Sequence, residues 1–283
     1  MQHAQTVHAL NEVLTTWRAH GDAIVFVPTM GNLHEGHIAL VKRARELGAG
    51  VVVSIFVNPM QFGVGDDYAE YPRTLEQDCA QLEGLAEVVF TPSVTEVYGR
   101  GLENSTRVEV PEVSDILCGA FRPGHFAGVT TVVAKLFNMV RPNVAVFGEK
   151  DFQQLFILRR MVEDLAFPIL IEGLPTVREV DGLAMSSRNQ YLSASERRQA
   201  PQLYQTLLEL KEGFSQQRAS VAELEKEAEH KLKQYGFEPD YVSVRNGGDL
   251  SANITAGCQC VVLAAAYLGK ARLIDNMSWV NQG

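Results

Sequence analysis

Two histidines, His34 and His37, follow an apolar run near the beginning of the chain. If a helix begins around them, their spacing of three places both rings on one face. The N-terminus of a helix offers unpaired N–H groups and a partial positive charge, which favour a bound anion. The same charge disfavours a protonated imidazole, so we expect two neutral rings that donate hydrogen bonds. Gly36 carries no side chain, which would let a phosphate or a flat ring reach the backbone.

Two other interpretations of the histidine pair exist. The zinc motif H-E-x-x-H places its histidines four residues apart, whereas these are three apart, so Glu35 does not complete a zinc site. Two unrelated surface histidines are the alternative that this segment alone leaves open.

Amide side chains, Asn58 and Gln61, follow the next apolar run. An ordinary turn is an equally good interpretation of this segment alone, because asparagine and proline favour turns. The carboxyl ends of parallel strands meet at one edge of a sheet, however, which places the segment beside the histidines. The polar segment 63–73 comes next. It is either a mobile flap whose carboxylates help to hold magnesium or a plain exposed loop.

A lysine in an unusual position follows a third apolar run, 144–147. Lys150 lies at the start of a predicted helix, where its charge repels the positive end of the helix dipole. An anion bound at that helix start would explain the position. Gln154 lies one turn further along and is expected to face the same way.

Two further segments combine cationic side chains with hydrogen-bond donors. Arg122 and His125 precede a predicted helix and could bind a carboxylate or a phosphate at its start. Ser186, Ser187 and Arg188 offer two hydroxyl groups and a fixed guanidinium charge, a set that suits a triphosphate. A loop between two predicted domains, as this one is, can close over a ligand.

The elements that must position these residues begin with short apolar runs. The runs lack the polar and apolar alternation of a half-exposed strand, which indicates strands buried on both faces of a parallel sheet. Because predicted helices alternate with them, we expect an open, Rossmann-like, doubly wound α/β sheet with right-handed crossovers. The predicted strands are 23–27, 51–57, 87–90, 144–147 and 169–171, and the predicted helices are 37–47, 75–84, 127–140 and 152–163.

The pattern changes near residue 176. We expect a nucleotide- and substrate-binding domain over 1–176 and a smaller α+β domain over 177–283 that closes over the active site. Two S-x-x-E capping boxes mark the helix starts of the smaller domain. Its predicted elements are helices from Ser193 to about Gly213 and from Ser220 to about Tyr235, strands over 241–244, 260–267 and 271–275, and a turn over 267–270.

Composition restricts the partners of the chain. It has 283 residues, of which 46% are hydrophobic, enough for a sizeable core in one large or two ordinary domains. The net charge of −9 provides no general electrostatic surface for nucleic acid. Residues 1–176 carry 13 basic and 21 acidic side chains, whereas residues 177–283 carry 12 and 13. A phosphate must therefore be bound by a few locally placed cations.

The cysteines and the hydropathy pattern indicate the compartment. The four cysteines are too scattered for a disulfide framework, and the C-x-C spacing of Cys258 and Cys260 is not that of metal ligands. A secretory signal pattern is missing, and the longest apolar run, 261–268, is far shorter than the ~20 residues that span a bilayer. We therefore expect a cytoplasmic protein that has no membrane partner.

Together, the motifs resemble a known family. The segment from His34 to His37 is similar to the H-x-G-H motif of the class I nucleotidyltransferase superfamily, and M-S-S-R-N resembles its K-M-S-K-S phosphate loop. More narrowly, five motifs in order resemble the pantothenate synthetase (pantoate–β-alanine ligase) family. They are P-T-M-G-N-L-H-E-G-H, F-V-N-P-M-Q-F, R-P-G-H-F, G-E-K-D-F-Q-Q and M-S-S-R-N-Q-Y-L, and they extend from Pro28 to about Leu192.

The resemblance implies a two-step reaction on a homodimer with ATP and Mg²⁺. The carboxylate of pantoate would attack the α-phosphate of ATP, giving pantoyl adenylate and pyrophosphate, and the amine of β-alanine would then displace AMP to give pantothenate. His37 would assist the departure of pyrophosphate as a donor, Lys150 would hold phosphate and Asp151 the ribose. Gln61 and Gln154 would bind the hydroxyl and carboxylate oxygens of pantoate.

The resemblance also assigns the remaining site residues, although it assigns no metal ligand. The residues that it implies are catalytic His37, His34, Lys150 and Arg188; ATP-binding Met30, Gly31, Asn32, Leu33, His34, Glu35, Gly36, His37, Gly148, Glu149, Lys150, Asp151, Val177, Met185, Ser186, Ser187 and Arg188; and substrate-binding Gln61, Gln154, Asn58 and His125. Either Arg122 or Arg188 would bind the β-alanine carboxylate.

The residue types agree with this chemistry, because displacement at a phosphate requires positioning and preorganised donors rather than a nucleophilic side chain. A G-x-S-x-G nucleophile motif does not occur. The nearest alternative is another H-x-G-H adenylyl- or cytidylyltransferase. A class I aminoacyl-tRNA synthetase would need a basic tRNA-binding surface. A non-catalytic nucleotide-binding protein would be expected to have lost some of the histidines and cations.

Overall fold

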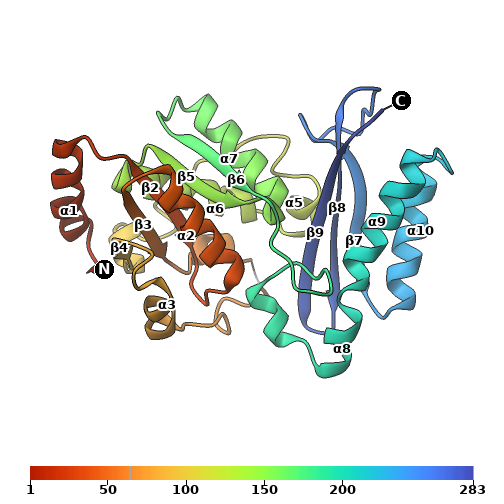
Figure 1. The fold of residues 1–283 in the computed structure, drawn as a ribbon, viewed down its shortest axis with the longest axis horizontal. Helices are drawn as coiled ribbons and strands as arrows, with labels where there is room; N and C mark the ends of the chain where they lie inside the picture. Colours follow the sequence, from red (N-terminus) through yellow and green to blue (C-terminus); the bar gives the residue numbers. More distant parts are fainter. Residues whose placement is uncertain (64, 283) are drawn as a thin grey trace. The chain divides into compact units, whose positions relative to one another are not determined.

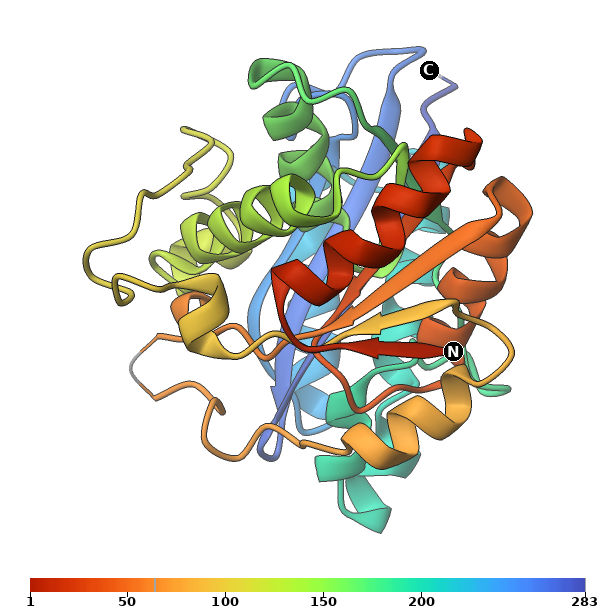
Figure 2. The ribbon, with the colours of Figure 1, turned by 90° about the vertical axis from the view of Figure 1, so that its left-hand side faces the viewer.

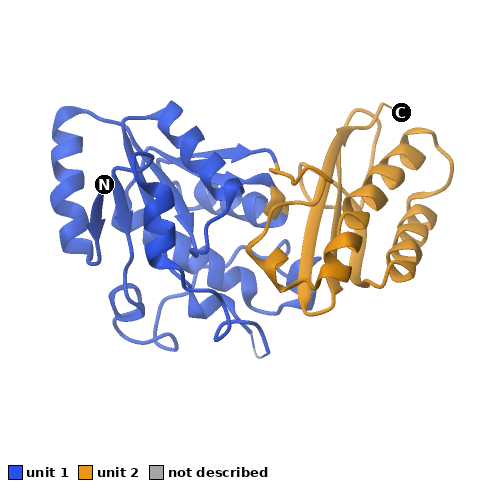
Figure 3. Ribbon diagram, turned by 60° about the horizontal axis from the view of Figure 1, so that its bottom comes forward, with its two compact units in different colours: residues 1–149, 153–175 blue, residues 150–152, 176–283 orange. Residues whose placement is uncertain are grey.

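The computed structural model describes residues 1–63 and 65–282 of the chain. They form two compact units (Figure 3). Unit 1 contains residues 1–149 and 153–175, and unit 2 contains residues 150–152 and 176–283. The chain therefore enters unit 2 at residues 150–152, which include the predicted phosphate-binding Lys150. It returns to unit 1 for residues 153–175 and then enters unit 2 again. The roles predicted for the two domains stay predictions.

Unit 1 is built on a parallel sheet of six strands in the order β1-β4-β3-β2-β5-β6 (Figure 1). All the pairings are parallel, as the uninterrupted apolar runs predict. The strands are β1 (Gln2–Ala4), β2 (Ile24–Thr29), β3 (Gly50–Ile55), β4 (Val88–Phe90), β5 (Val144–Gly148) and β6 (Leu170–Leu174). Five of them match the predicted runs with ends shifted by a few residues.

Helices cover both faces of this sheet, because both faces are apolar. Val25 and Val27 of β2 pack with α2 (Glu35–Leu47) and α3 (Leu75–Leu82), whereas Phe26 contacts Phe137 of α6 (His125–Val140) on the opposite face. Figure 2 shows α6 together with α1 (Val7–His20) on the opposite side of the sheet from α3. The predicted doubly wound fold is confirmed. The remaining helices of this part of the chain are α4 (Val94–Val97), α5 (Cys118–Phe121) and α7 (Phe152–Asp164), with short 3₁₀ turns η1 (Pro59–Gln61) and η2 (Glu149–Asp151).

The pairing of β2 determines where the polar loops meet. β2 pairs with β3 on one side and with β5 on the other. The three strands are parallel, so the segments after Thr29, Ile55 and Gly148 leave the same edge of the sheet. The helix after β2 packs on the face opposite to α6, which makes this edge the place where open α/β sheets bind ligands.

Unit 2 contains an antiparallel sheet in the order β7-β8-β9. Alternate residues of β8, such as Val262 and Ala264, pack against helices that carry Leu207 and Leu224. The three predicted strands of this domain are confirmed. The elements of unit 2 are η3 (Ser187–Tyr191), α8 (Ala194–Gln199), α9 (Gln202–Ser215), α10 (Val221–Gln234), β7 (Glu238–Asn246), β8 (Gln259–Leu268) and β9 (Ala271–Val280).

Two predictions about the elements fail for identifiable reasons. The single helix expected from Ser193 to Gly213 is wrong, because α8 ends before Pro201 and α9 begins after it. Proline has no N–H to donate, and its ring clashes with the preceding helical turn. The elements β1 and α1 are not predicted from the sequence: β1 has three residues, and α1 buries only Leu10 and Leu14. The three residues of β1 are too few for a periodic signal, whereas Val7, Leu10, Leu14 and Trp17 of α1 recur at helical spacing, a signal that could have predicted this helix.

Among the residues that the structure describes, no helix is long and apolar enough to span a membrane.

One glycine is required by the packing of α6 on η1. A Cβ atom on Gly128 would lie 2.4 Å from the carbonyl oxygen of Met60 and 2.6 Å from Cα of Gln61. The Gly128→Ala variant must therefore push η1 away from α6, and we expect its free energy of unfolding to fall by about 1–3 kcal/mol. Urea denaturation measures this change. Gly99→Ala is the matched control, since its Cβ would make an ordinary 3.5 Å contact; equal stabilities for the two variants would contradict the packing argument.

Candidate active site

The two histidines lie at the start of α2 and are hydrogen-bonded to its first turn. His34 is the N-cap residue, and its Nδ1 accepts the N–H of Gly36 at 3.1 Å. Nδ1 of His37 accepts the backbone N–H of His34 at 3.3 Å. An Nδ1 atom that accepts a hydrogen bond cannot carry a proton, so each ring can donate only from Nε2. The ring centroids are 4.0 Å apart, which confirms that the two rings share one face.

The turn before the histidines has a left-handed backbone and is held by a buried carboxylate. Gly31 and Asn32 both have positive φ, at 82° and 51°. Asp78 of α3 accepts the N–H groups of Asn32 and Leu33 at 3.0 and 2.8 Å, together with the hydroxyl of Thr74. Asp78 is 1% exposed. This carboxylate therefore determines the path of the predicted ATP-binding turn.

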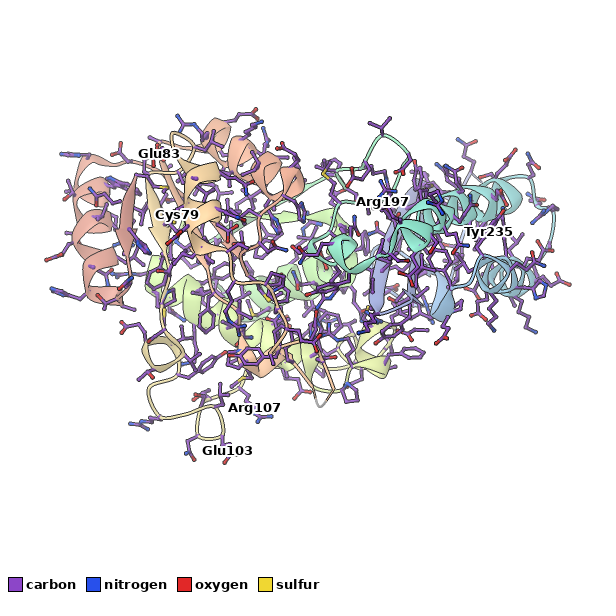
Figure 4. The ribbon with its side chains drawn as sticks, turned by 90° about the horizontal axis from the view of Figure 1, so that it is seen from below. Cys79, Glu83, Glu103, Arg107, Arg197 and Tyr235 are labelled. Atoms are coloured by element: carbon purple, nitrogen blue, oxygen red, sulfur yellow. The ribbon has the colours of Figure 1, made fainter. Side chains whose placement is uncertain are left out.

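Sequence reasoning missed Asp78. A carboxylate in the first turn of a helix is usually explained by the helix dipole, and nothing in the sequence distinguishes Asp78 from Glu76 in that respect. Cys79, the next residue, and Glu83 mark the position of α3 in Figure 4. The missing signal is burial, which follows from the packing of α3 and not from its composition.

Asn58 and Gln61 form an amide pair after β3. Asn58 is 1% exposed, and its Nδ2 donates to Oε1 of Gln61 and to the carbonyl oxygen of Gly128, both at 3.1 Å. Its Oδ1 accepts the N–H of Met60 and the hydroxyl of Tyr98. Both polar atoms of Asn58 are thus engaged twice, which favours a supporting role over direct substrate binding. Gln61 is half-buried.

Arg122 and His125 support the same segment. Arg122 forms a 2.8 Å ion pair with Asp66 and a 3.1 Å hydrogen bond with Nε2 of His125. Because the guanidinium can only donate, Nε2 accepts, and Nδ1 of His125 donates to the carbonyl oxygen of Gln61 at 2.8 Å. The pair therefore ties the 63–73 segment to Gln61. Val64 of this segment lies outside the described residues.

The carboxylate of Asp66 is stabilised in its charged form. Burial raises the pKa of Asp66, but the hydrogen bonds from Arg122 and Gly63 and the charge of Arg122 outweigh it, and the net shift is downward. A depressed pKa means that ionised Asp66 stabilises the folded segment.

The end of β5 brings two predicted residues to the same edge of the sheet. Gly148 is the last residue of β5, and Glu149 follows it. In α7, Gln153 is 4% exposed and bonds to the carbonyl oxygens of Val113 and Ile116. The neighbouring Gln154 is half-buried, and no hydrogen bond of its amide is found among the described residues. Gln153 is thus structural, and Gln154 is the amide suited to a ligand.

Lys150 and Asp151 belong to unit 2. Nδ2 of Asn276, on β9, donates to the carbonyl oxygen of Lys150 at 2.9 Å and so fixes this turn. The Lys150 ammonium group has no hydrogen bond or ion pair within the described part of the chain, a state that suits an anionic ligand.

The segment after residue 176 folds back on itself. Met185 donates its N–H to the carbonyl oxygen of Val177 at 3.0 Å, so these two predicted nucleotide neighbours are adjacent. Arg178 bonds Asp275 at 2.6 and 2.9 Å, and its guanidinium stacks 3.9 Å from the ring of Tyr204. Asp275 and Asn276 therefore hold both predicted ATP-binding segments of unit 2. Sequence reasoning missed both residues.

The predicted phosphate loop opens the 3₁₀ turn η3. Ser186 caps it by accepting the N–H of Arg188 at 3.2 Å. Ser187 and Arg188 follow, and all three are half-buried. Two hydroxyl groups and one guanidinium therefore lie on a single short turn, as the sequence indicates.

A metal centre is not built into the described part of the chain. Within residues 1–63 and 65–282, no group of three His, Cys, Asp or Glu side chains is placed to hold an ion.

Comparison with known proteins identifies the family. The family model described as "Pantoate-beta-alanine ligase" matches residues 2–278. Proteins named pantothenate synthetase are 56% identical over 269 residues in Idiomarina loihiensis, covering 95% of each chain, and 51% identical over 280 residues in Shewanella loihica, covering 99% of each. This chain belongs to the pantoate-beta-alanine ligase family.

Solved structures of the family agree. Pantothenate synthetase from Thermus thermophilus is 46% identical with a TM-score of 0.88, covering 98% of this chain and 99% of that one. Pantoate-beta-alanine ligase from Francisella tularensis, complexed with Beta-gamma ATP and beta-alanine, is 35% identical with a TM-score of 0.83, covering 98% and 97%. The ligase assignment made from the motifs is confirmed.

Replacement of Asp78 tests its role in the turn. In Asp78→Asn, the side-chain NH₂ group of the new asparagine must face the backbone N–H of either residue 32 or residue 33. One hydrogen bond is therefore lost and the turn loosens. We expect faster amide hydrogen exchange at these two residues and a KM for ATP raised about tenfold. Asp164→Asn, an exposed carboxylate on α7, is the control. Unchanged exchange and unchanged KM would show that Asp78 does not hold the turn.

The lowered pKa of Asp66 gives a pH-dependent prediction. Its stabilising effect is fully present above the unfolded pKa of ~4 and is lost as the pH falls through the lower folded pKa. At pH 7, Asp66→Asn should speed amide exchange in residues 65–73 about fivefold. The variant and the wild type should converge only once the pH lies below the lowered folded pKa of Asp66. A difference that persists after Asp66 is protonated in the folded protein would mean that the ion pair is not the anchor.

Proposed function

We propose that this protein condenses pantoate with β-alanine to give pantothenate, using ATP and passing through pantoyl adenylate. In the first step a carboxylate oxygen of pantoate bonds to the α-phosphorus, and the bond to the bridging oxygen breaks, releasing pyrophosphate. In the second step the uncharged β-alanine amine attacks the acyl carbon, loses a proton and expels AMP. The family match across residues 2–278 is the observation that carries this proposal.

The histidine turn is proposed to bind the triphosphate. Nε2–H groups of His34 and His37 donate from a helix N-terminus, where backbone N–H groups and the dipole also favour an anion. Negative charge grows on the bridging oxygen as pyrophosphate departs, and a donor fixed in advance stabilises it most. His37 is the proposed donor. The residues proposed to surround it are Met30, Gly31, Asn32, Leu33, Glu35 and Gly36.

Cations are proposed to act at two further segments. Lys150 would hold phosphate, with Gly148, Glu149 and Asp151 binding the rest of the nucleotide. Arg188, Ser186 and Ser187 would bind phosphate oxygens, with Val177 and Met185 against the nucleotide. Either Arg122, which also pairs with Asp66, or Arg188 would bind the β-alanine carboxylate.

Amide groups are proposed to bind pantoate. Gln61 and Gln154 are half-buried and uncharged, so they can bind the hydroxyl and carboxylate oxygens without changing the charge at the reacting carboxylate. Asn58 and His125 contact Gln61 from its side chain and its backbone, which supports a positioning role for both.

Mg²⁺ is proposed to enter with ATP. The ion usually keeps several waters and takes most of its other ligands from substrate phosphates, so it does not require a cage of protein carboxylates. This fits the described residues, which contain no such cage. Bound there, the ion would neutralise charge on the phosphates. A homodimer and a cytoplasmic location are proposed from the family resemblance alone.

The exchange of pyrophosphate into ATP tests the first step without β-alanine. We expect exchange that requires pantoate. In His37→Ala and Lys150→Ala the exchange rate should fall on the order of 10²–10³-fold, because each change removes one preorganised donor or cation. Arg100→Ala, a change outside the proposed site, is a control that should retain the wild-type rate.

Exchange supported by an amino acid instead of pantoate would favour another adenylate-forming enzyme. Wild-type exchange rates in both site variants, with normal folding by circular dichroism, would contradict the role assignments.

A further inference from the structure

A buried tyrosine lies at the far end of the hydrogen-bond chain that reaches Gln61. Tyr98 is 2% exposed, and its hydroxyl donates to Oδ1 of Asn58 at 2.8 Å. Its ring lies 6.3 Å from that of Phe56, and the ammonium of Lys135 is 5.3 Å from its centroid. Nothing in the sequence singles out Tyr98, which lies 40 residues from Asn58 along the chain.

The direction of this chain of hydrogen bonds is forced by backbone groups. The N–H of Met60 can only donate and faces one end of the Asn58 amide at 3.2 Å, so that atom is Oδ1. The carbonyl of Gly128 can only accept and faces the other end at 3.1 Å, so that atom is Nδ2. Tyr98 must then donate to Oδ1, and Nδ2 must donate to Gln61.

The same logic fixes Gln61. Its oxygen faces Nδ2 of Asn58, so its NH₂ group points the other way, where it lies 3.2 Å from the sulfur of Met30. A thioether is a weak acceptor, and an incoming oxygen would replace it at little cost. Gln61 therefore offers N–H donors to a ligand, as hydroxyl and carboxylate oxygens require. Reversed, the amide would present its carbonyl oxygen to a carboxylate and repel it.

We propose that Tyr98 is a positioning residue that, through Asn58, holds the Gln61 amide with its N–H donors toward pantoate. The inference rests on the proposed function, in which Gln61 binds this substrate. Burial raises the pKa of Tyr98, which keeps its hydroxyl protonated and able to donate. Without the hydroxyl, Oδ1 of Asn58 keeps only the bond from Met60, and the amide plane of Asn58 is less firmly held.

A double-mutant cycle distinguishes this role from simple packing. The variants are Tyr98→Phe, Gln61→Ala and the double variant, with Tyr267→Phe on β8 as a control for the loss of a phenol hydroxyl. Pantoate-dependent pyrophosphate exchange gives the KM for pantoate and the KM for ATP of each. Tyr98→Phe should raise the KM for pantoate about fivefold and leave that for ATP unchanged. In the Gln61→Ala background it should have no further effect, because the group through which it acts is gone.

Additive effects in the cycle, or equal changes in both KM values, would mean that Tyr98 acts only through packing and would overturn the proposal. The side-chain amide NMR signals of Asn58 and Gln61 give a readout that does not depend on catalysis. Both should shift in Tyr98→Phe, and an unmoved Gln61 signal would also overturn the proposal. Absence of pantoate-dependent exchange in the wild-type protein would instead reject the proposed function, while the NMR comparison would still decide whether Tyr98 positions Gln61.

Discussion

Parallel pairing of β2 with β3 and β5 is the constraint on which the site of unit 1 depends. Each strand is buried on both faces, so its polar residues can appear only where it ends. Since the three strands run in the same direction, the histidine turn, the amide pair and the Gly148 turn leave the sheet at one edge. Three short apolar runs in the sequence, which become β2, β3 and β5, are therefore enough to bring these segments to one edge of the sheet.

A second constraint follows from the first. Loops that leave a buried sheet carry backbone N–H and carbonyl groups that must be satisfied, and buried side chains supply the partners. Asp78 does this for the histidine turn and Asn58 for η1. In unit 2, Asn276 does the same for the Lys150 turn. The residues that satisfy the backbone hydrogen-bonding groups of these turns are thus also those that orient the predicted ligand-binding groups.

This division accounts for what the sequence could and could not predict. Val51–Val53 and the strands beside them were predictable because a short, continuous apolar run bounded by polar residues is typical of a buried strand, and the five ordered motifs led to the family. Asp78, Tyr98 and Asn276 were not predictable, since their importance comes from burial and from partners 40 to 126 residues away. The helix break at Pro201 was also predictable, because a proline inside a predicted helix should limit its length. The capping box at Ser193 instead led to the prediction of one long helix.

The excess of acidic side chains in residues 1–176 is compatible with the proposed binding of an anion. Residues 1–176 carry 13 basic and 21 acidic side chains, yet several of those charges have assigned partners within unit 1: Arg122 with Asp66, and Arg43 with Glu46 and Glu172. In the proposed site, unit 1 would therefore meet an anion chiefly with neutral donors, namely imidazole N–H, amide N–H and backbone N–H groups. Neutral donors form strong hydrogen bonds where water is excluded, and they avoid the desolvation penalty that a buried cation incurs. In the proposed function an acidic unit 1 can therefore bind phosphate with neutral donors, and the two proposed cations, Lys150 and Arg188, belong to unit 2.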